Sequence, residues 1–506
     1  MATGDTVEGA VERQLASLHA ALAERDAIIA AQAVQLTAQA EQLAAQGAQL
    51  TKLNEQLDEL KKQLGRNSSN SNLPPSSDGP GAGSRGGIPT KPRVKSGRQR
   101  GGQKGRRGSH RALLGSDQVD EFVDLFPEAC EGCAHSLPKE HDAAACRFQQ
   151  LELRDHRPHV TEWRRHEVRC PRCRAWTRAA HDPNTIPRSA FGPHLTAVVV
   201  LLTGAYHLSR RKAQRLLHEL FAISVSLGAV SSMEKRASAA LKSAHEEALR
   251  EVQHAAIKHS DATTWLRSGQ LMSLWVVATV AATVYQILGN GRTETIRPMF
   301  GPPTGILVSD RATVFSFWCM KRRQVCLAHL LRKFVAFSEN EGRAGELGRS
   351  LLECTVLIFE YWHGYKDGLL TRDEMLFWMG PVQRAFEQLL ERGDKANLKS
   401  VSGSCRDILA HREALWTFVN HDGVEPTNNH GELELRDFVL WRKRSFGTQS
   451  ERGERFAERV MTVVRTARKQ GKAVLDFLVH SLRACIEKTA PPRLLGAGLT
   501  PCQQPP

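Results

Sequence analysis

Apolar residues recur at every seventh position along the first 64 residues. They form one continuous seam: Leu15, Leu22, Ile29, Leu36, Leu43, Leu50, Leu57 and Leu64. A companion seam holds Leu18, Leu53 and Leu60, with Gln32, Gln39 and Gln46 in its middle. Such heptads predict a coiled coil over residues 1–64 that pairs with a second copy of the chain, and the glutamines would set register or partner number. A single helix that packs against its own protein is the alternative.

Apolar spacing of three and four residues dominates residues 186–252 and predicts a helical domain. Within it, the basic run Arg210-Arg-Lys-Ala-Gln-Arg-Leu-Leu217 is followed by Ile223-Ser-Val-Ser226. This order suits a helix-turn-helix that touches DNA. A plain helical linker domain explains the pattern equally well, because apolar stripes at this spacing are usually core.

The period changes to that of β-strands in residues 253–333, which predicts the first part of an α/β core. The predicted strands cover residues 257–261, 274–279, 283–288, 305–310 and 325–328, and a helix is expected to start at His329. Two of these strands end in an acid, Asp261 and Asp310. Three adjacent strands and a crossover would bring both acids to one edge of a mixed sheet.

Residues 271–291 carry no charge and raise the question of a membrane span. The stretch is rich in β-branched residues and contains Thr279, Thr283 and Gln286. These features favour two adjacent buried strands over a lipid-facing helix, so no membrane partner is expected.

The charge balance favours a polyanionic partner such as nucleic acid. Lys and Arg total 69 against 54 for Asp and Glu, a formal net charge of +15. Residues 65–112 combine turn formers with a glycine-rich basic run that holds no acid from Arg85 to Arg111. We expect a disordered linker that contacts DNA phosphates without reading bases. The candidate contacts are Arg98, Arg100, Lys104, Arg106 and Arg107. A solvated linker is the alternative.

Four of the eleven cysteines form two Cys-x-x-Cys pairs, which are Cys130 with Cys133 and Cys170 with Cys173. Two such pairs can supply four thiolates to one zinc ion, and a closed four-sulfur site is structural rather than catalytic. The sequence therefore predicts a zinc-finger module over residues 113–185.

Between the two pairs, alternation at Phe148, Leu151 and Leu153 predicts strands, and Cys146 is expected to be a small buried residue. The N-terminus lacks the basic start, apolar stretch and cleavage site of a signal peptide. Thinly spread cysteines in a large chain fit a reducing cytoplasm better than disulfides.

Acids gathered at one sheet edge have a chemical use. Clustered carboxylates raise each other's pKa unless a cation neutralises them, and hard oxygen ligands suit Mg²⁺ or Mn²⁺. Two such ions can activate a nucleophile and stabilise the leaving oxygen of a phosphodiester. From the pattern alone, Asp261 and Asp310 are explained equally well as cap or turn residues.

The C-terminal part of the chain resembles a known family. The resemblance is carried by Thr427-Asn-Asn-His-Gly-Glu-Leu-Glu-Leu-Arg436 and Trp441-Arg-Lys-Arg-Ser-Phe-Gly-Thr-Gln-Ser-Glu-Arg-Gly453, which are similar to the signature of the insertion-sequence-66 family of transposases. It spans nearly the whole chain, with Ser309-Asp-Arg311 and Arg323-Gln-Val-Cys-Leu-Ala-His329 in the family's order.

The resemblance implies a DDE transposase with a ribonuclease-H-like core, whose two Asp and one Glu bind two Mg²⁺ or Mn²⁺ ions. Matched motif by motif, these residues are Asp261, Asp310 and Glu432, and Glu434 is the second choice for the Glu. Residues 334–425 then form a helical insertion, and residues 426–482 hold the helix that carries Glu432 and a basic C-terminal part of the core. That helix should begin near Asn428, a good capping residue. Residues 483–506 form a tail.

The expected architecture is therefore multidomain: an N-terminal coiled coil, a zinc-finger module, a helical domain and an α/β ribonuclease-H-like core with a helical insertion. Arg442, Lys443 and Arg444 are further candidate phosphate contacts, with a solvated helix face as the alternative. His329 is expected to be structural rather than part of the site.

The implied function is binding of inverted-repeat element ends, metal-dependent cleavage and strand transfer into target DNA. The expected partners are DNA, a second copy through the coiled coil and accessory proteins of the same element, in a bacterial cytoplasm near the nucleoid. Several residues depart from the family's pattern: Ala262, Leu433-Glu434, Phe315 and Leu327. A decayed copy that only binds DNA, or a hydrolytic nuclease that cuts without joining, are the alternatives.

Overall fold

The computed structural model describes residues 7–64, 112–142, 145–153, 158–180 and 186–496. The chain divides into two compact units. The first combines Met1–Gly87 with His329–Arg406, and the second combines Ile88–Ala328 with Asp407–Pro506. The five candidate DNA contacts of the basic linker, Arg98 to Arg107, lie outside the described residues.

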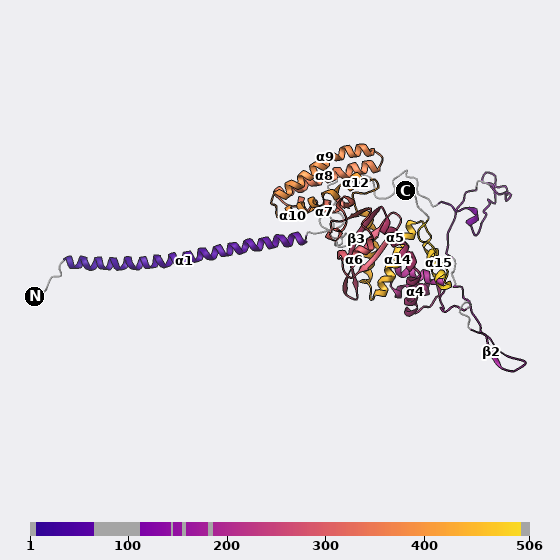
Figure 1. The fold of residues 1–506 in the computed structure, drawn as a ribbon. Coiled ribbons are helices and arrows are strands. Elements are labelled where there is room, and N and C mark those ends of the chain that lie inside the picture. The colour runs from indigo at the N-terminus through magenta and orange to yellow at the C-terminus, as the bar shows by residue number, and fades with distance from the viewer. Residues whose placement is uncertain (1–6, 65–111, 143–144, 154–157, 181–185, 497–506) are drawn as a thin grey trace. The chain divides into compact units, whose positions relative to one another are not determined.

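The N-terminal helix α1 runs without a break from Val7 to Leu64 (Figure 1). Strong helix formers, chiefly Ala, Leu, Gln and Glu, make up most of its 58 residues. Leu22, Leu36 and Leu43 of the predicted seam are 49%, 65% and 68% exposed. The helix is therefore present as predicted, and its apolar seam faces solvent.

The described residues 329–406 of the first unit are mainly helical. Helix α7 (Leu327–Ser338) leads into a hairpin of α8 (Gly342–Lys366) and α9 (Arg372–Lys395), drawn in orange in Figure 1. α9 begins with a capping box, in which the Thr371 hydroxyl and the Glu374 carboxylate accept each other's backbone N–H. Helix α10 (Ser402–Ala410) follows.

In the second unit, residues 193–254 form the helices that the apolar spacing predicts, and several of them share a core with the sheet described below. They are α2 (Pro193–Val200), a π-helical turn (Leu201–Ala205), α3 (Arg210–Phe221), α4 (Leu227–Ala240) and α5 (Lys242–His254). Helices α2, α3 and α4 share a small core made of Val199, Leu217, Val225, Val230 and Met233. This core collects the apolar positions that the helical spacing predicts.

A five-stranded mixed sheet forms the centre of the second unit. Its strands are β3 (Ile257–Arg267), β4 (Gln270–Ala278), β5 (Thr283–Leu288), β6 (Ile306–Ser309) and β7 (Arg323–Val325). The order is β5-β4-β3-β6-β7. Strands β3, β4 and β5 are antiparallel neighbours, whereas β6 and β7 continue the sheet parallel to β3. Helix α6 (Thr293–Phe300) lies in the crossover from β5 to β6.

Two predicted boundaries were wrong. β3 continues beyond Asp261 to Arg267, because it pairs with β4 up to Arg267 opposite Gln270. Asp261 therefore lies inside a strand and not at its end. β7 precedes its predicted position, and α7 starts at Leu327, whose N–H donates to Pro426 O at 2.9 Å.

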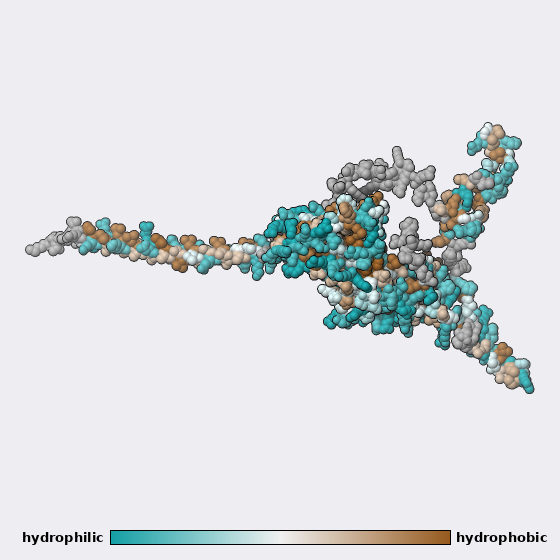
Figure 2. Space-filling view, turned by 45° about the horizontal axis from the view of Figure 1, so that its top comes forward, coloured by the Kyte–Doolittle hydropathy of each residue, from teal (hydrophilic) through white to brown (hydrophobic). Residues whose placement is uncertain are grey.

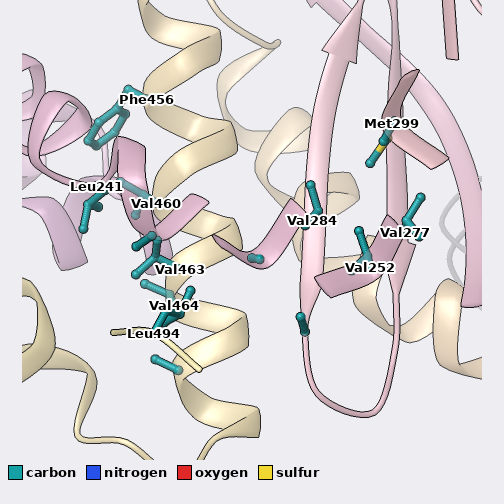
Figure 3. Close-up of a cluster of buried hydrophobic side chains, with 14 of the residues drawn as sticks. Leu241, Val252, Val277, Val284, Met299, Phe456, Val460, Val463, Val464 and Leu494 are labelled. Atoms are coloured by element: carbon teal, nitrogen blue, oxygen red, sulfur yellow. The ribbon is translucent and has the colours of Figure 1, made fainter. Parts of the chain in front are cut away.

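Both faces of the sheet are covered, as the alternation along β4 shows. Leu274 and Val276 pack on one face with Phe438. Trp275 and Val277 belong to the core on the other face, part of which is drawn in Figure 3. This double burial explains why residues 271–291 are uncharged. No helix in the part of the chain that the structure describes is long and apolar enough to cross a membrane.

The C-terminal helices complete the second unit. They are α11 (Arg412–Leu415), α12 (Thr417–Asn420), α13 (Asn429–Ser445), α14 (Glu451–Lys469) and α15 (Val474–Glu487). α13 packs on β3 and β4, and α14 packs on β5. Gly447 permits the turn between them at φ +95°, where a Cβ atom would lie 2.1 Å from Leu266 O. The turn thereby ties the end of α13 to β3.

The segment around the paired cysteines departs from prediction. Residues 145–153 form no strand, and Phe148 and Leu153 are 90% and 84% exposed. Cys146, expected to be buried, is exposed. The strands flank the second pair instead, as β1 (Glu167–Arg169) and β2 (Trp176–Arg178). Alternation without a second apolar surface to bury it does not make a stable strand.

His245 in α5 links stability to pH. Burial and the charge of Arg459 lower its pKa to about 4, although a hydrogen bond with the Tyr285 backbone and the charge of Glu246 act in the opposite direction. Its Nε2 atom has no hydrogen-bond partner among the described residues. The unfolded imidazole binds a proton below about pH 6.5 and the folded one only near pH 4, so the free energy of unfolding falls as pH drops through this window.

We therefore expect His245→Gln to be less acid-sensitive than the parent protein. The parent should lose roughly 2 kcal/mol more stability than the variant between pH 7 and pH 5. Urea unfolding at both pH values measures the difference. Identical pH dependence of the two proteins would contradict the assignment.

Candidate functional site

Asp261 and Asp310 belong to adjacent parallel strands. Ile257 of β3 lies beside Ile306 of β6, and His259 lies beside Val308. Continuing this register by two residues brings Asp261 level with Asp310, which directly follows β6. Each carboxylate also accepts a local backbone N–H, Asp261 from Ala262 at 2.8 Å and Asp310 from Ala312 at 3.0 Å. These bonds orient the two side chains.

Asn428 fixes the start of α13 beside the same strands. Its side-chain N–H donates to Ser260 O at 2.7 Å, one residue before Asp261, and its backbone N–H donates to Cys326 Sγ at 3.1 Å. Its side-chain oxygen lies 3.3 Å from His259 Nδ1. The helix begins near Asn428 as predicted, but the Asn428 side chain makes no capping bond to it. It is a buried clamp between β3, the residue after β7 and α13.

Glu432 lies in the first turn of the helix that this clamp positions. Its N–H donates to Asn428 O at 3.0 Å, and one of its carboxylate oxygens lies within 4.8 Å of Cys326 Sγ. Gly431 makes room for the clamp, because a Cβ atom there would lie 2.8 Å from Asn428 Oδ1. The helix thus presents Glu432 from a start that is tied to β3 next to Asp261.

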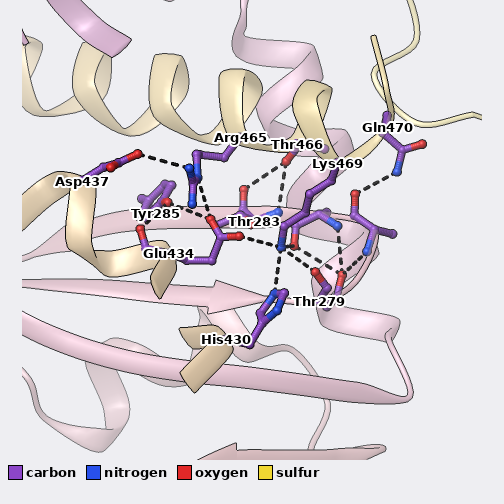
Figure 4. A network of polar contacts seen from close by, with 12 residues as sticks. Thr279, Thr283, Tyr285, His430, Glu434, Asp437, Arg465, Thr466, Lys469 and Gln470 are labelled. Carbon is purple, nitrogen blue, oxygen red and sulfur yellow. Dashed lines mark hydrogen bonds and ion pairs between the residues drawn. The ribbon is translucent and has the colours of Figure 1, made fainter. Parts of the chain in front are cut away.

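Glu434, the second choice for the acidic residue, has a different environment (Figure 4). It is 5% exposed and forms ion pairs with Arg465 at 2.8 Å and Lys469 at 3.1 Å. Tyr285 Oη donates to its backbone oxygen at 2.8 Å. Burial raises the pKa of Glu434, but Lys469 and Arg465 together hold it below its ordinary value. Both carboxylate oxygens are engaged by cations, which makes Glu434 a residue that joins α13 to α14.

The network extends from Lys469 toward β3. Lys469 Nζ lies 3.0 Å from His430 Nε2 and donates to Thr279 O at 2.6 Å. Burial lowers the pKa of Lys469 to about 8, whereas Glu434 raises it. The His430 ring contacts the His259 ring, with centroids 5.0 Å apart. Arg465 and Lys469 are four residues apart on an otherwise buried face of α14, a signal that could have been found in the sequence.

Buried cations surround the segment that holds Asp310. Arg323 is 1% exposed, donates to Asp310 O at 3.1 Å and lies over the Phe315 ring. Burial lowers the pKa of the Arg323 guanidinium and Asp310 raises it. Arg311 pairs with Asp407. These contacts hold the backbone of Asp310 and place positive charge beside its carboxylate.

The other predicted basic contacts differ among themselves. Arg442 donates to the hydroxyls of Thr263, at 3.0 Å, and Thr264, which holds α13 on β3. Lys443 and Arg444 are exposed near the end of α13. Arg442 therefore has a packing role that the sequence did not reveal.

The residues that depart from the family's pattern lie in the interior of the unit, except Leu433, which is 59% exposed. Phe315 and Leu327 are each 1% exposed, and Ala262 packs against the same cluster as Phe315. Glu434 of the Leu433-Glu434 departure belongs to the network described above. None of these positions supplies one of the three proposed acids.

Each cysteine pair forms the same backbone knuckle. Ala134 N–H donates to Cys130 O at 2.8 Å, and Arg174 N–H donates to Cys170 O at 2.9 Å. Ala134 and Arg174 both take a left-handed conformation, at φ 55° and 54°. Backbone N–H groups of Gly132 and Cys133 lower the pKa of Cys130, and those of Cys173 and Arg172 lower the pKa of Cys170. This stabilises thiolates, the form that binds metal.

The two knuckles are not gathered into one cluster. Among the described residues, no three of the four thiols lie within ligand distance of one another. The structure therefore contains two knuckles of suitable local form, without a four-sulfur site assembled from them.

Comparison with known proteins places this geometry in a family. No curated protein matches the chain. A family of unknown function (DUF6444) matches residues 23–112. The model of the Transposase IS66 family matches residues 188–455, more than half of the chain, and includes the helical domain, the mixed sheet, the helical insertion and α13. The chain belongs to the IS66 family of transposases.

Proposed function

We propose that this chain is a DDE transposase that cleaves the ends of its own element and joins them to target DNA. Asp261, Asp310 and Glu432 would hold two Mg²⁺ or Mn²⁺ ions in a ribonuclease-H-like core. The observation that carries the proposal is the register of β3 and β6, combined with the Asn428 clamp. They support the proposal because Asp261 and Asp310 lie level on neighbouring strands, and the helix that carries Glu432 starts at a residue bonded to Ser260, next to Asp261.

The donor set suits the proposed ions. Three carboxylates offer the hard oxygen ligands that Mg²⁺ and Mn²⁺ prefer. When bound, two divalent ions supply charge neutralisation and activation of an oxygen nucleophile. The protein's part is positioning: Arg323 holds the Asp310 backbone, and Asn428 holds the first turn that carries Glu432.

The remaining parts would serve DNA handling. The exposed seam of α1 suits pairing with the α1 helix of a second copy, so that two element ends are processed together. The linker cations Arg98, Arg100, Lys104, Arg106 and Arg107, with Lys443 and Arg444, would contact phosphates. Accessory proteins of the same element would be further partners.

A structural zinc ion is the second metal that we propose. The thiols of Cys130, Cys133, Cys170 and Cys173 would close around one Zn²⁺ when the two knuckles meet. We expect the purified chain to carry about one zinc ion, by analogy with structural four-cysteine sites. Cys170→Ser should lose the zinc and Cys146→Ser should keep it, as measured by metal analysis. Equal zinc content in the two variants would contradict the site.

The assay for the proposed function uses duplex DNA that carries the inverted repeats flanking the coding region. With Mg²⁺, the chain should nick the repeat ends and produce strand-joined molecules, and a chelator should stop both. Cut but unjoined products would favour the hydrolytic nuclease. Binding without cleavage would favour a decayed copy, an alternative suggested by Ala262 beside Asp261.

A further inference from the structure

Helices α3 and α4 form a helix-turn-helix. α3 ends where Ala222 takes a left-handed conformation at φ 51°, and Ile223 N–H donates back to Leu217 O at 3.1 Å. α4 is capped by Ser226, whose hydroxyl accepts from Ala229 N at 3.1 Å. Gln214 Nε2 donates to Val225 O at 2.6 Å and holds the turn against α3. The sequence was compatible with a helix-turn-helix or a plain helical linker domain. The backbone of α3 and α4 favours the helix-turn-helix.

The inner side of this helix pair is neutral. Leu217, Val230 and Met233 pack in its apolar core. Glu234, the acid of α4, is 5% exposed and accepts from Arg210 Nε at 2.8 Å. The negative charge of α4 is thus compensated within the helix pair.

The outer side of α3 is cationic. Arg211, Lys212 and Arg215 are exposed and have no ion-pair partner in the described part of the chain. Their spacing of one and four residues places them on neighbouring positions of the helix surface. Glu219 is the acid of α3 and lies toward its C-terminal end. Three uncompensated cations on one helix suit a polyanion such as DNA.

The exposed stripe of α4 holds few of the side chains that read bases well. After Leu227 at the start of the helix, it consists of Gly228, Ser232, Lys235 and Ala239. Specific base contacts in the major groove are made chiefly by Arg, Lys, Asn and Gln side chains, and Lys235 is the one such side chain in this stripe. Its small residues permit close approach to a duplex. Arg452 of α14 donates to Ser231 Oγ at 2.7 Å and adds a cation beside it.

We infer that the α3–α4 unit binds duplex DNA through its phosphates and discriminates little between sequences. The inference rests on the proposed function and assigns one DNA contact to it. Arg211, Lys212 and Arg215 grip the phosphate backbone, while the small residues of α4 lie against the groove. Phosphate contacts set orientation and affinity without carrying sequence information. Selection of the element ends therefore belongs to other parts of the protein.

The test measures binding without cleavage. The full chain is titrated, in chelator, against two unrelated 30-base-pair duplexes labelled with fluorescein, and anisotropy is recorded over a range of salt concentrations. Arg211→Ala/Arg215→Ala should bind both duplexes more weakly. The slope of log K against log salt should fall by about 2, close to one per lost phosphate contact.

Arg468→Ala/Arg483→Ala is the matched control, because it removes two exposed cations from α14 and α15 of the same unit. This control should keep the slope of the parent protein. An unchanged slope in the α3 variant would overturn the inference, and so would a loss confined to one duplex, which indicates base reading. Because no metal is present, a chain that fails to cleave DNA still gives a decisive result.

Discussion

Asp310→Asn is expected to reduce Mg²⁺-dependent cleavage and joining by at least about 10²- to 10³-fold, the range seen when one electrostatic group is removed from an active site. The change replaces one carboxylate oxygen by an amide and removes the charge that a divalent ion needs. Asp310 directly follows β6, and its backbone oxygen stays bound to Arg323 in the variant. The fold should therefore be unaffected.

The measurement compares nicked and strand-joined products of the parent and variant at equal protein concentration. Asp476→Asn is the matched control, because Asp476 is exposed in the first turn of α15 and undergoes the same chemical change. Thermal unfolding and DNA binding in chelator should be the same for all three proteins. Full activity of Asp310→Asn would remove Asp310 from the proposed site.

Glu432→Gln and Glu434→Gln are expected to fail in opposite ways. Glu432 is proposed to bind metal, so its variant should fold normally and lose activity on the scale expected for Asp310→Asn. Glu434 is buried between Arg465 and Lys469. Its variant leaves the buried Lys469 without an opposite charge and Arg465 with Asp437 alone, and breaking such a buried pair costs about 3–5 kcal/mol. We therefore expect the unfolding temperature to fall by on the order of 10 °C.

The assignment has an internal check. Lys469→Met, added to Glu434→Gln, removes the cation that has lost its opposite charge and should recover part of the lost stability. Differential scanning calorimetry and the cleavage assay are run on the same preparations of four proteins. These are the parent, Glu432→Gln, Glu434→Gln and the Glu434→Gln/Lys469→Met double variant. A stable but inactive Glu434→Gln, together with an active Glu432→Gln, would exchange the roles of the two residues.

Local sequence pattern was sufficient wherever a structure depends on neighbours in the chain. The heptads predicted α1, the three- and four-residue spacing predicted the helices of residues 193–254, and apolar runs predicted β4, β5 and β6. The uncharged residues 271–291 were correctly assigned to strands, because β-branched side chains favour a sheet that is buried on both faces. The family was also predicted correctly, from short motifs in the sequence that resemble those of the family.

Predictions from local sequence pattern were wrong where contacts with a segment distant in the sequence determine the structure. β3 extends past Asp261 only because β4 offers a long partner. Residues 145–153 alternate but form no strand, since no apolar surface covers them. Asn428 looked like a helix cap, and it instead binds Ser260 and Cys326, which lie more than 100 residues away. A capping propensity describes only the residue's own helix.

The sequence alone determined the helices, the mixed sheet, the family and the three candidate acids, because each of these is encoded in residues close together or in a matched motif. The family resemblance had ranked Glu432 before Glu434, and the tertiary structure added the surroundings of each carboxylate. The two acids are two residues apart on one helix, and what separates them is the environment: Glu434 faces Arg465 and Lys469 of α14, whereas Glu432 lies at the end tied to β3. The sequence gives the charge of a side chain, but the packing of the folded chain determines which residue that side chain pairs with.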